Sequence, residues 1–256
     1  MADVKLSQLA ANSPASVAAG ATLWTGKAAI MGLALEYVSA TQFRVTSGAA
    51  WVPDAGQLVE LAASATITLS GIGNSAWAHV YLVYAAGQAP TIEAVTTDPA
   101  APYYGSARAK SGAGGTSRRY LGSIRTNATG QIIRFHHNPS ANLVSYLADI
   151  NGSGLYVLNN GAATASTNVA ATVVPLTARS MLGFAENTDP TALVFISQPD
   201  IGAASYSNIL LFLRGTRVLL GVIALDASQR FNYAYSSAPS SGNGLSVWCT
   251  GYYFDR

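Results

Sequence analysis

Charged residues are scarce in this sequence. Only 10% of the 256 residues are charged, against about 25% in an ordinary globular domain. The net charge of +2 is too small to indicate a nucleic-acid partner. A surface with few charges and much Ala, Gly, Ser and Thr does little to prevent self-association, so we expect a homo-oligomer. The alternative is an all-β protein that uses Ser, Thr and Asn for solubility.

Cysteine and long apolar runs are also lacking. The single cysteine, Cys249, excludes an intrachain disulfide and a cysteine-based zinc site, and its apolar surroundings predict burial. The most apolar stretch, residues 209–225, contains Arg214 and Arg217. It therefore predicts two short strands joined by a tight turn rather than a membrane-spanning helix. The first residues lack a basic start followed by an apolar run, so no export signal is expected.

Motifs for catalysis are missing as well. There is no Gly-x-Ser-x-Gly elbow, and the carboxylates are scattered, so we expect no enzyme. His136 and His137 are adjacent on an expected strand and point to opposite faces, which disfavours a shared metal. The glycine-rich residues 112–117 lack the Lys-Ser/Thr ending of a phosphate loop. We therefore assign no catalytic, cofactor or metal residues, and the receptor-contacting residues remain unassigned.

One run of basic residues interrupts this low charge. Six cations and no acids lie between Asp98 and Asp149: Arg108, Lys110, Arg118, Arg119, Arg125 and Arg134. They form either a basic patch for an acidic partner or a set of residues paired with acids elsewhere in the fold, and we favour the second interpretation.

Three regions follow one another along the chain. Residues 1–26 combine a short apolar segment with a small-residue linker, which is typical of an attachment piece. Residues 27–137 are rich in strand patterns, including a hairpin around residues 126–130, and form a β-rich module. Residues 138–143 are the expected boundary. Residues 138–256 then predict a β-sandwich, jelly-roll-like, so the fold class is all-β.

The expected strands of the last region recur at regular spacing. They lie near residues 144–150, 154–159, 169–177, 191–198, 207–214, 217–225, 230–236 and 245–254. Residues 181–185 are expected to form a turn, and residues 97–110 have room for one short helix. The aromatic residues near the C-terminus, Phe231, Tyr233, Tyr235, Trp248, Tyr252, Tyr253 and Phe254, are expected in the sandwich core and in subunit contacts.

Several segments resemble tail fibres and related virion proteins of tailed bacteriophages. Residues 77–84 (WAHVYLVY), 96–103 (TTDPAAPY) and 118–133 (RRYLGSIRTNATGQII) resemble a fibre module, and residues 4–9 (VKLSQL) resemble a fibre N-terminus. Residues 218–253 are similar to the terminal β-sandwich of phage appendages. No coiled coil or long shaft is present, so a short fibre, spike or adaptor fits the length better than a long fibre.

The resemblance implies a receptor-binding protein of the virion. Such a protein is made in the host cytoplasm, acts as a homo-oligomer, most often a trimer, and attaches to a host-surface glycan or protein. Residues 1–26 would bind other tail or baseplate proteins, and residues 138–256 would be the receptor-binding head, with no nucleic acid and no membrane insertion. The alternative is a structural adaptor, baseplate or head-decoration protein without direct receptor binding; a glycan-degrading spike is a weaker third.

Overall fold

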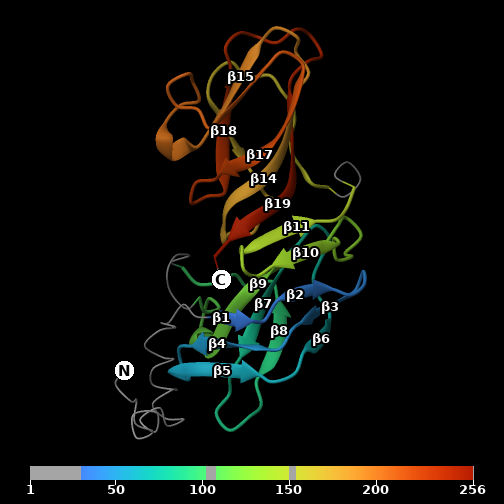
Figure 1. Ribbon diagram of the computed structural model, residues 1–256, viewed down its shortest axis with the longest axis vertical. Coiled ribbons are helices and arrows are strands. Elements are labelled where there is room, and N and C mark those ends of the chain that lie inside the picture. Colours follow the sequence, from blue (N-terminus) through green and yellow to red (C-terminus); the bar gives the residue numbers. More distant parts are fainter. Residues whose placement is uncertain (1–29, 102–107, 150–153, 256) are drawn as a thin grey trace, which may run out of the picture.

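The computed structural model describes residues 30–101, 108–149 and 154–255, and almost all its regular structure is β-strand (Figure 1). Two short 3-10 helices, η1 (Gly115–Ser117) and η2 (Pro199–Ile201), are the exceptions among these residues. The all-β class expected from the sequence is confirmed. Within the same residues, no helix has the length and apolar character needed to cross a membrane.

The first half of the chain builds three small groups of antiparallel strands. Strands β1 (Ile30–Gly32), β4 (Gly48–Val52) and β5 (Gln57–Leu61) form one sheet. Strands β8 (Thr91–Val95), β7 (Trp77–Val83) and β9 (Arg118–Arg125) form another. Strands β2 (Leu35–Tyr37), β3 (Gln42–Val45) and β6 (Ala65–Thr68) join a larger sheet through β10 (Phe135–Asn138).

The second half is an eight-stranded sandwich. Its strands are β12 (Tyr156–Gly161), β13 (Thr167–Ala170), β14 (Ala178–Asn187), β15 (Leu193–Ser197), β16 (Leu211–Arg214), β17 (Arg217–Ala224), β18 (Arg230–Tyr235) and β19 (Leu245–Phe254). The first strand pairs with the last, the second with the last but one, and so on inward to β15 and β16. The two sheets are therefore ordered β12-β19-β14-β17 and β13-β18-β15-β16. A long hairpin rolled up in this way is a jelly roll.

One sheet connects the two halves. Strand β19 pairs with β11 (Leu143–Tyr146), β11 pairs with β10, and β10 pairs with β2. Strands β10 and β11 therefore lie between the lower and upper parts of the molecule (Figure 1). The boundary expected at residues 138–143 falls on the hairpin that joins these two strands. A single apolar cluster extends from Leu33 in the first half to Phe254 in the last strand.

Two expectations about strands are wrong. Residues 181–185 are not a turn but the middle of the ten-residue strand β14. Both faces of that strand carry apolar residues, and Gly183 interrupts them, so the alternation that signals a strand is hidden. Strand β13 ends at Ala170, and residues 171–177 form a loop that side chains of the first half hold in place.

The apolar stretch 209–225 contains the two expected strands, but they do not pair with each other. Strand β16 pairs with β15 and strand β17 pairs with β14, so the chain passes from one sheet to the other at Gly215. In the region expected to hold a short helix, Pro99 and Lys110 form an isolated β-bridge, while residues 102–107 lie outside the described residues.

Candidate functional site

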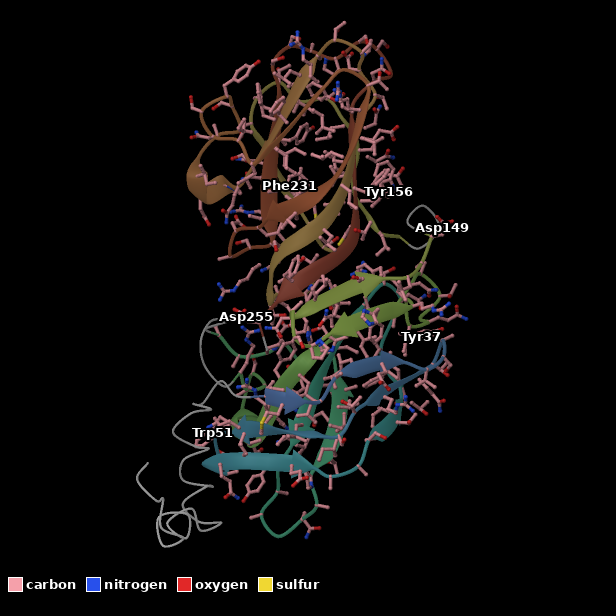
Figure 2. The ribbon with its side chains drawn as sticks, in the orientation of Figure 1. Tyr37, Trp51, Asp149, Tyr156, Phe231 and Asp255 are labelled. Atoms are coloured by element: carbon pink, nitrogen blue, oxygen red, sulfur yellow. The ribbon has the colours of Figure 1, made fainter. Side chains whose placement is uncertain are left out.

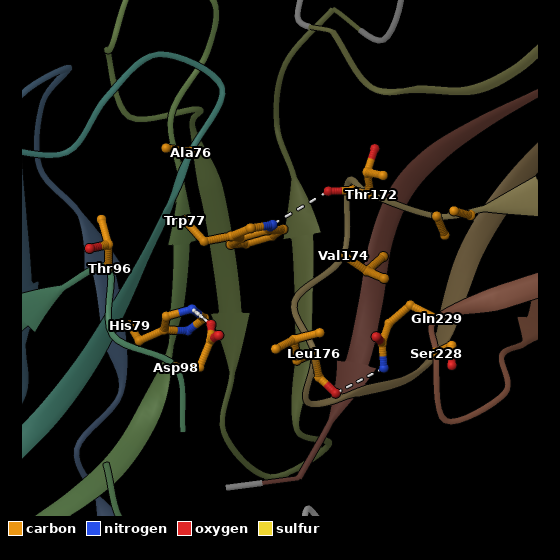
Figure 3. Close-up of a pocket in the computed structure, with 12 residues that line it drawn as sticks. Ala76, Trp77, His79, Thr96, Asp98, Thr172, Val174, Leu176, Ser228 and Gln229 are labelled. Atoms are coloured by element: carbon orange, nitrogen blue, oxygen red, sulfur yellow. Dashed lines mark hydrogen bonds and ion pairs between the residues drawn. The ribbon is translucent and has the colours of Figure 1, made fainter. Parts of the chain in front are cut away.

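A pocket of about 410 Å³ lies where the two halves of the chain meet (Figure 3). Its first wall comes from strand β7 and the segment that follows β8. Its second wall comes from the loop after β13 and from the turn before β18. The lining is Ala76, Trp77, His79, Thr96, Asp98, Ala170, Ala171, Thr172, Val174, Leu176, Ser228 and Gln229. It combines one indole ring and several aliphatic side chains with a few polar groups.

Trp77 and His79 reach the pocket from the same face of strand β7, because side chains two residues apart on a strand share a face. The Trp77 indole N–H points to the carbonyl of Thr172 at 3.4 Å. The guanidinium of Arg125 lies 5.3 Å from the Trp77 ring centroid and donates to the same carbonyl at 2.9 Å. The indole is therefore held between an arginine of the first half and a loop of the second half.

Gln229 forms part of the opposite wall. Its backbone has a φ of 54°, a left-handed conformation that is uncommon for a residue with a side chain. Its amide nitrogen donates to the carbonyl of Leu176 at 2.9 Å. Figure 3 shows the amide oxygen directed toward the pocket, and no donor among the described residues reaches that oxygen. A hydrogen-bond acceptor is thus available to a bound molecule.

A chain of hydrogen bonds runs from the pocket into the core. Asp98 Oδ1 lies 3.1 Å from His79 Nε2, and His79 Nδ1 lies 2.8 Å from Ser123 Oγ. Ser123 in turn bonds Tyr120 at 2.8 Å, and Tyr120 bonds Thr177 at 2.9 Å. When the proton of His79 is on Nε2, it is donated to Asp98 at the pocket end. Thr177 then donates to Tyr120, Tyr120 to Ser123, and Ser123 to His79 Nδ1, so each hydroxyl of the series donates once.

The ionisation of His79 follows from this position. Burial disfavours the charged imidazolium and lowers the pKa of His79, and this effect outweighs the opposing attraction of the Asp98 carboxylate. His79 is almost fully buried, whereas the Asp98 side chain is 55% exposed. The pocket therefore presents an accessible carboxylate whose orientation is fixed by a neutral histidine.

Ser123, His79 and Asp98 are the residue types of a hydrolytic triad, but their order in space is reversed. A nucleophilic serine must face the substrate, with the carboxylate behind the histidine. Here the carboxylate faces the pocket, while Ser123 is buried behind the imidazole and engaged by Tyr120. The arrangement suits hydrogen bonding to a ligand better than nucleophilic attack.

The basic residues singled out in the sequence do not gather into one patch. Lys110 and Arg118 both pair with Glu93, at 2.5 and 3.3 Å. Arg108 contacts Asp255, which lies at the junction of the two halves (Figure 2). Arg119 is completely buried, Arg125 packs on Trp77, and Arg134 is exposed. Arg108, Lys110 and Arg118 thus pair with acids elsewhere in the fold, as the favoured interpretation expected of the whole set.

The two adjacent histidines lie on opposite faces of β10, as predicted. His136 is exposed, whereas His137 is buried and its Nδ1 accepts the backbone N–H of Leu35 at 3.0 Å. Among the described residues, no group of three or more His, Cys, Asp or Glu side chains is arranged to hold a metal ion.

The C-terminal aromatic residues lie mostly in the core, as predicted. Phe231, which Figure 2 labels within the sandwich, is fully buried. Tyr252 is fully buried as well, and Phe254 exposes only 2% of its surface. Cys249 is buried too, and burial raises the pKa of its thiol to about 12. The attachment segment expected at residues 1–26 lies outside the described residues.

Sequence reasoning missed the pocket itself. Trp77 and Asp98 appeared only as members of segments that resemble a fibre module or as the limit of the basic run, and Gln229 only within residues 218–253. The one available signal was the unusual density of polar and aromatic residues in WAHVY, in which Trp77 and His79 are two residues apart. Comparisons of the chain with protein-family models, with curated proteins and with solved structures found no match.

Proposed function

We propose that the chain is a bacteriophage virion protein, a tail fibre or receptor-binding protein, that attaches the particle to a glycan on the host-cell surface. The observation that carries this proposal is the pocket between the two halves. The resemblance of the strand segments to phage fibre modules supports the same conclusion. So does the jelly roll, an architecture shared by viral capsid and lectin domains.

The lining of the pocket favours a sugar over other small ligands. An indole ring offers a flat apolar face, against which the C–H face of a sugar ring can pack. The carboxylate of Asp98 and the amide oxygen of Gln229 are acceptors for hydroxyl groups. Among the described residues, no lysine or arginine lines the pocket, which makes it unsuited to a phosphate, and the polar groups make it unsuited to a lipid chain.

A second candidate function is a structural adaptor in the tail, the baseplate or the head surface. It is favoured by apolar side chains exposed along one side of the sandwich, because they suit a protein interface. In that case the protein would assemble in the particle without binding cells. Removing residues 1–26 would block assembly under either function, so cell binding is the measurement that separates the two.

The direct test replaces Asp98 by asparagine in the full-length protein. Asp98→Asn keeps the size of the side chain but removes the charged acceptor, which contributes about 1.5–3 kcal/mol to a hydrogen bond. We expect binding to host cells, or to the surface polysaccharide prepared from them, to weaken by about 10- to 100-fold. Isothermal titration with that polysaccharide measures the change.

Asp54→Asn is the matched control, because Asp54 is exposed and lies outside the pocket. It should bind as the wild type does. Equal binding by wild type and Asp98→Asn would exclude the pocket as the receptor site. Wild-type protein that binds neither cells nor polysaccharide would favour the adaptor. Release of reducing sugar by the wild type would contradict the expectation that the protein is not an enzyme.

A further inference from the structure

Large apolar side chains are exposed along one side of the sandwich. Leu210, Phe212, Val218, Leu220 and Val222 expose between 37% and 66% of their surface. They belong to strands β16 and β17 or to the residue just before them. Phe212 lies opposite Phe195 on one sheet, whereas Val218, Leu220 and Val222 lie on the outer face of the other sheet. We call the side of the sandwich where these two faces meet the β16–β17 edge. It holds five of the twelve large apolar residues that are exposed among the described residues.

The position of this surface in the fold is unusual. Strand β16 is the last strand of one sheet and β17 is the last strand of the other, and the turn at Gly215 joins them. Both sheets therefore end on the same side of the sandwich. Strand β17 pairs with β14 only, so its outer backbone edge has no strand partner among the described residues.

The apolar surface continues inward from β17. The register places Leu220 opposite Phe184, Phe184 opposite Trp248, and Trp248 opposite Tyr156. Neighbours in register share one face of a sheet. The Phe184 and Trp248 rings lie 5.4 Å apart, and the Trp248 and Tyr156 rings lie 4.6 Å apart. A row of large apolar side chains therefore crosses the outer face of this sheet.

Most of the edge strand lacks the usual protection against association. Exposed edges are usually protected by lysine, proline, a bulge or a covering element. Residues 218–224 of β17 contain no charge and no proline, and β17 pairs with β14 in regular register. Charge is confined to the end of the strand at the turn, where Arg214 and Arg217 lie. An edge of this kind favours a permanent partner.

The size of the surface and the charges at its border favour a second copy of the chain as that partner. On the outer face of the β17 sheet, Val218, Leu220, Val222 and Tyr156 expose on the order of 350 Å² per copy, close to half of the ~800 Å² that each partner of a standard interface buries. The border carries both signs of charge, because Glu186 lies opposite Val218 and Arg217 precedes it. Around a symmetry axis, the apolar residues of each copy meet one another and border charges of opposite sign complement each other.

We propose that copies of this chain associate through the β16–β17 edge, with Leu220 close to the symmetry axis. This assigns a surface to the homo-oligomer that the low charge content suggests, and it does not depend on what the pocket binds.

The first experiment measures the mass of the full-length protein in solution by light scattering at micromolar concentration. We expect an oligomer for the wild type and a shift toward monomer for Leu220→Glu and Val222→Glu, since each introduces a charge into the buried contact. Val38→Glu is the matched control. Val38 is 44% exposed and Val222 is 49% exposed, but Val38 lies in the turn after β2.

The second experiment uses the single native cysteine. Cys249 is buried, so Leu220→Cys introduces the only exposed thiol of the chain. Mild oxidation should link two copies of Leu220→Cys through a disulfide, and Val38→Cys should remain unlinked. This arm does not require a destabilising charge, and it reports on proximity even if the glutamate variants unfold.

Three results would overturn the proposal. The first is a wild-type protein that is monomeric at micromolar concentration. The second is an oligomer whose mass is the same in folded Leu220→Glu and Val222→Glu. The third is a Leu220→Cys variant that cross-links no faster than Val38→Cys, which would place the contact on another surface.

Discussion

At the scale of single residues, Asn187 makes an unusually complete set of hydrogen bonds. Its amide nitrogen donates to the carbonyls of Ala192 and Gly215, at 3.1 and 3.2 Å. Its oxygen accepts the hydroxyl of Tyr235 at 2.7 Å and the backbone N–H of Asp189 at 3.1 Å. The side chain is completely buried, so it joins both sheets of the sandwich to one turn without an unpaired polar group.

Replacing this residue should therefore be costly. Asn187→Ala leaves several buried polar groups without a partner, and each such group costs about 1–3 kcal/mol. We expect the free energy of unfolding to fall by about 2–4 kcal/mol, measured by urea denaturation. Asn159→Ala, at an exposed position of β12, should change it by less than about 0.5 kcal/mol. A similar small effect at Asn187 would contradict the described network.

His79 makes stability depend on pH. Its pKa in the folded protein is lowered from 6.5 by burial, so the unfolded chain takes up a proton more readily than the folded protein. The contribution of His79 is constant well above pH 6.5, and the free energy of unfolding falls as the pH drops below that value. His79→Gln should reduce this slope in denaturation curves recorded between about pH 7.5 and about pH 5.

The exposed His136 serves as the control for this measurement. His136→Gln leaves the buried imidazole in place, so it should keep the part of the slope that depends on His79. An unchanged slope in His79→Gln would mean that other groups account for the acid sensitivity.

At the scale of elements, Gly251 determines how closely β19 approaches β11. A Cβ atom at this position would lie 2.5 Å from the carbonyl oxygen of Val144 and 3.1 Å from the Cα of Ser145. Those atoms belong to backbone and cannot rotate away. The pairing of β19 with β11 is also the link between the sandwich and the first half of the chain.

We expect Gly251→Ala to lower the free energy of unfolding by about 1–3 kcal/mol, because the added methyl group overpacks the contact and forces the backbone of β11 to shift. Thermal denaturation followed by circular dichroism measures this loss. Gly73→Ala is the control, since a Cβ at Gly73 would meet no atom within 4 Å and its backbone does not require a positive φ. Equal melting temperatures for the two variants would refute the close approach of the strands.

Strand β18 is an element that the sequence predicted well, because it has one apolar face. In β18, the alternation of Phe231, Tyr233 and Tyr235 with smaller residues marks the core face directly. Strand β14 was missed because Leu182 and Phe184 on its outer face are as apolar as Met181 and Ala185 on the inner face. Gly183 completes the misleading pattern; a Cβ at this position would lie 2.5 Å from the end of the Ile223 side chain.

The pocket could not be predicted from any local pattern. Trp77 and Gln229 are more than half the chain apart, and only the rolled-up hairpin and the shared sheet bring them together. The same holds for Thr177 and Tyr120, whose hydrogen bond joins the two halves. Long-range pairing of strands decides such contacts, and the sequence of each strand carries little information about its partner.

At the scale of the whole molecule, the two halves share one core. The apolar cluster and the sheet through β10, β11 and β19 both cross the expected boundary at residues 138–143. We therefore expect residues 30–255 to unfold in one cooperative transition, with fluorescence and circular dichroism giving the same midpoint. The fragment 139–256 should be markedly less stable than the full chain, because its β11 and β19 lose the surface of the first half.

Two separate transitions, or a fragment as stable as the whole, would instead support independent modules. The distinction matters for tests of binding. Because both halves line the pocket, a fragment that fails to bind would not exclude a receptor site, and the full-length protein is the appropriate sample.

Strand β19 is central to the fold. It lies between β12 and β14 in the sandwich and also pairs with β11, and its aromatic residues reach into the core of the first half. A growing chain on the ribosome therefore has an incomplete central sheet until β19 emerges. A chain that terminates before or within β19 would lack this strand or part of it, so premature termination there would yield unfolded chains for proteolysis rather than defective subunits that enter an assembly.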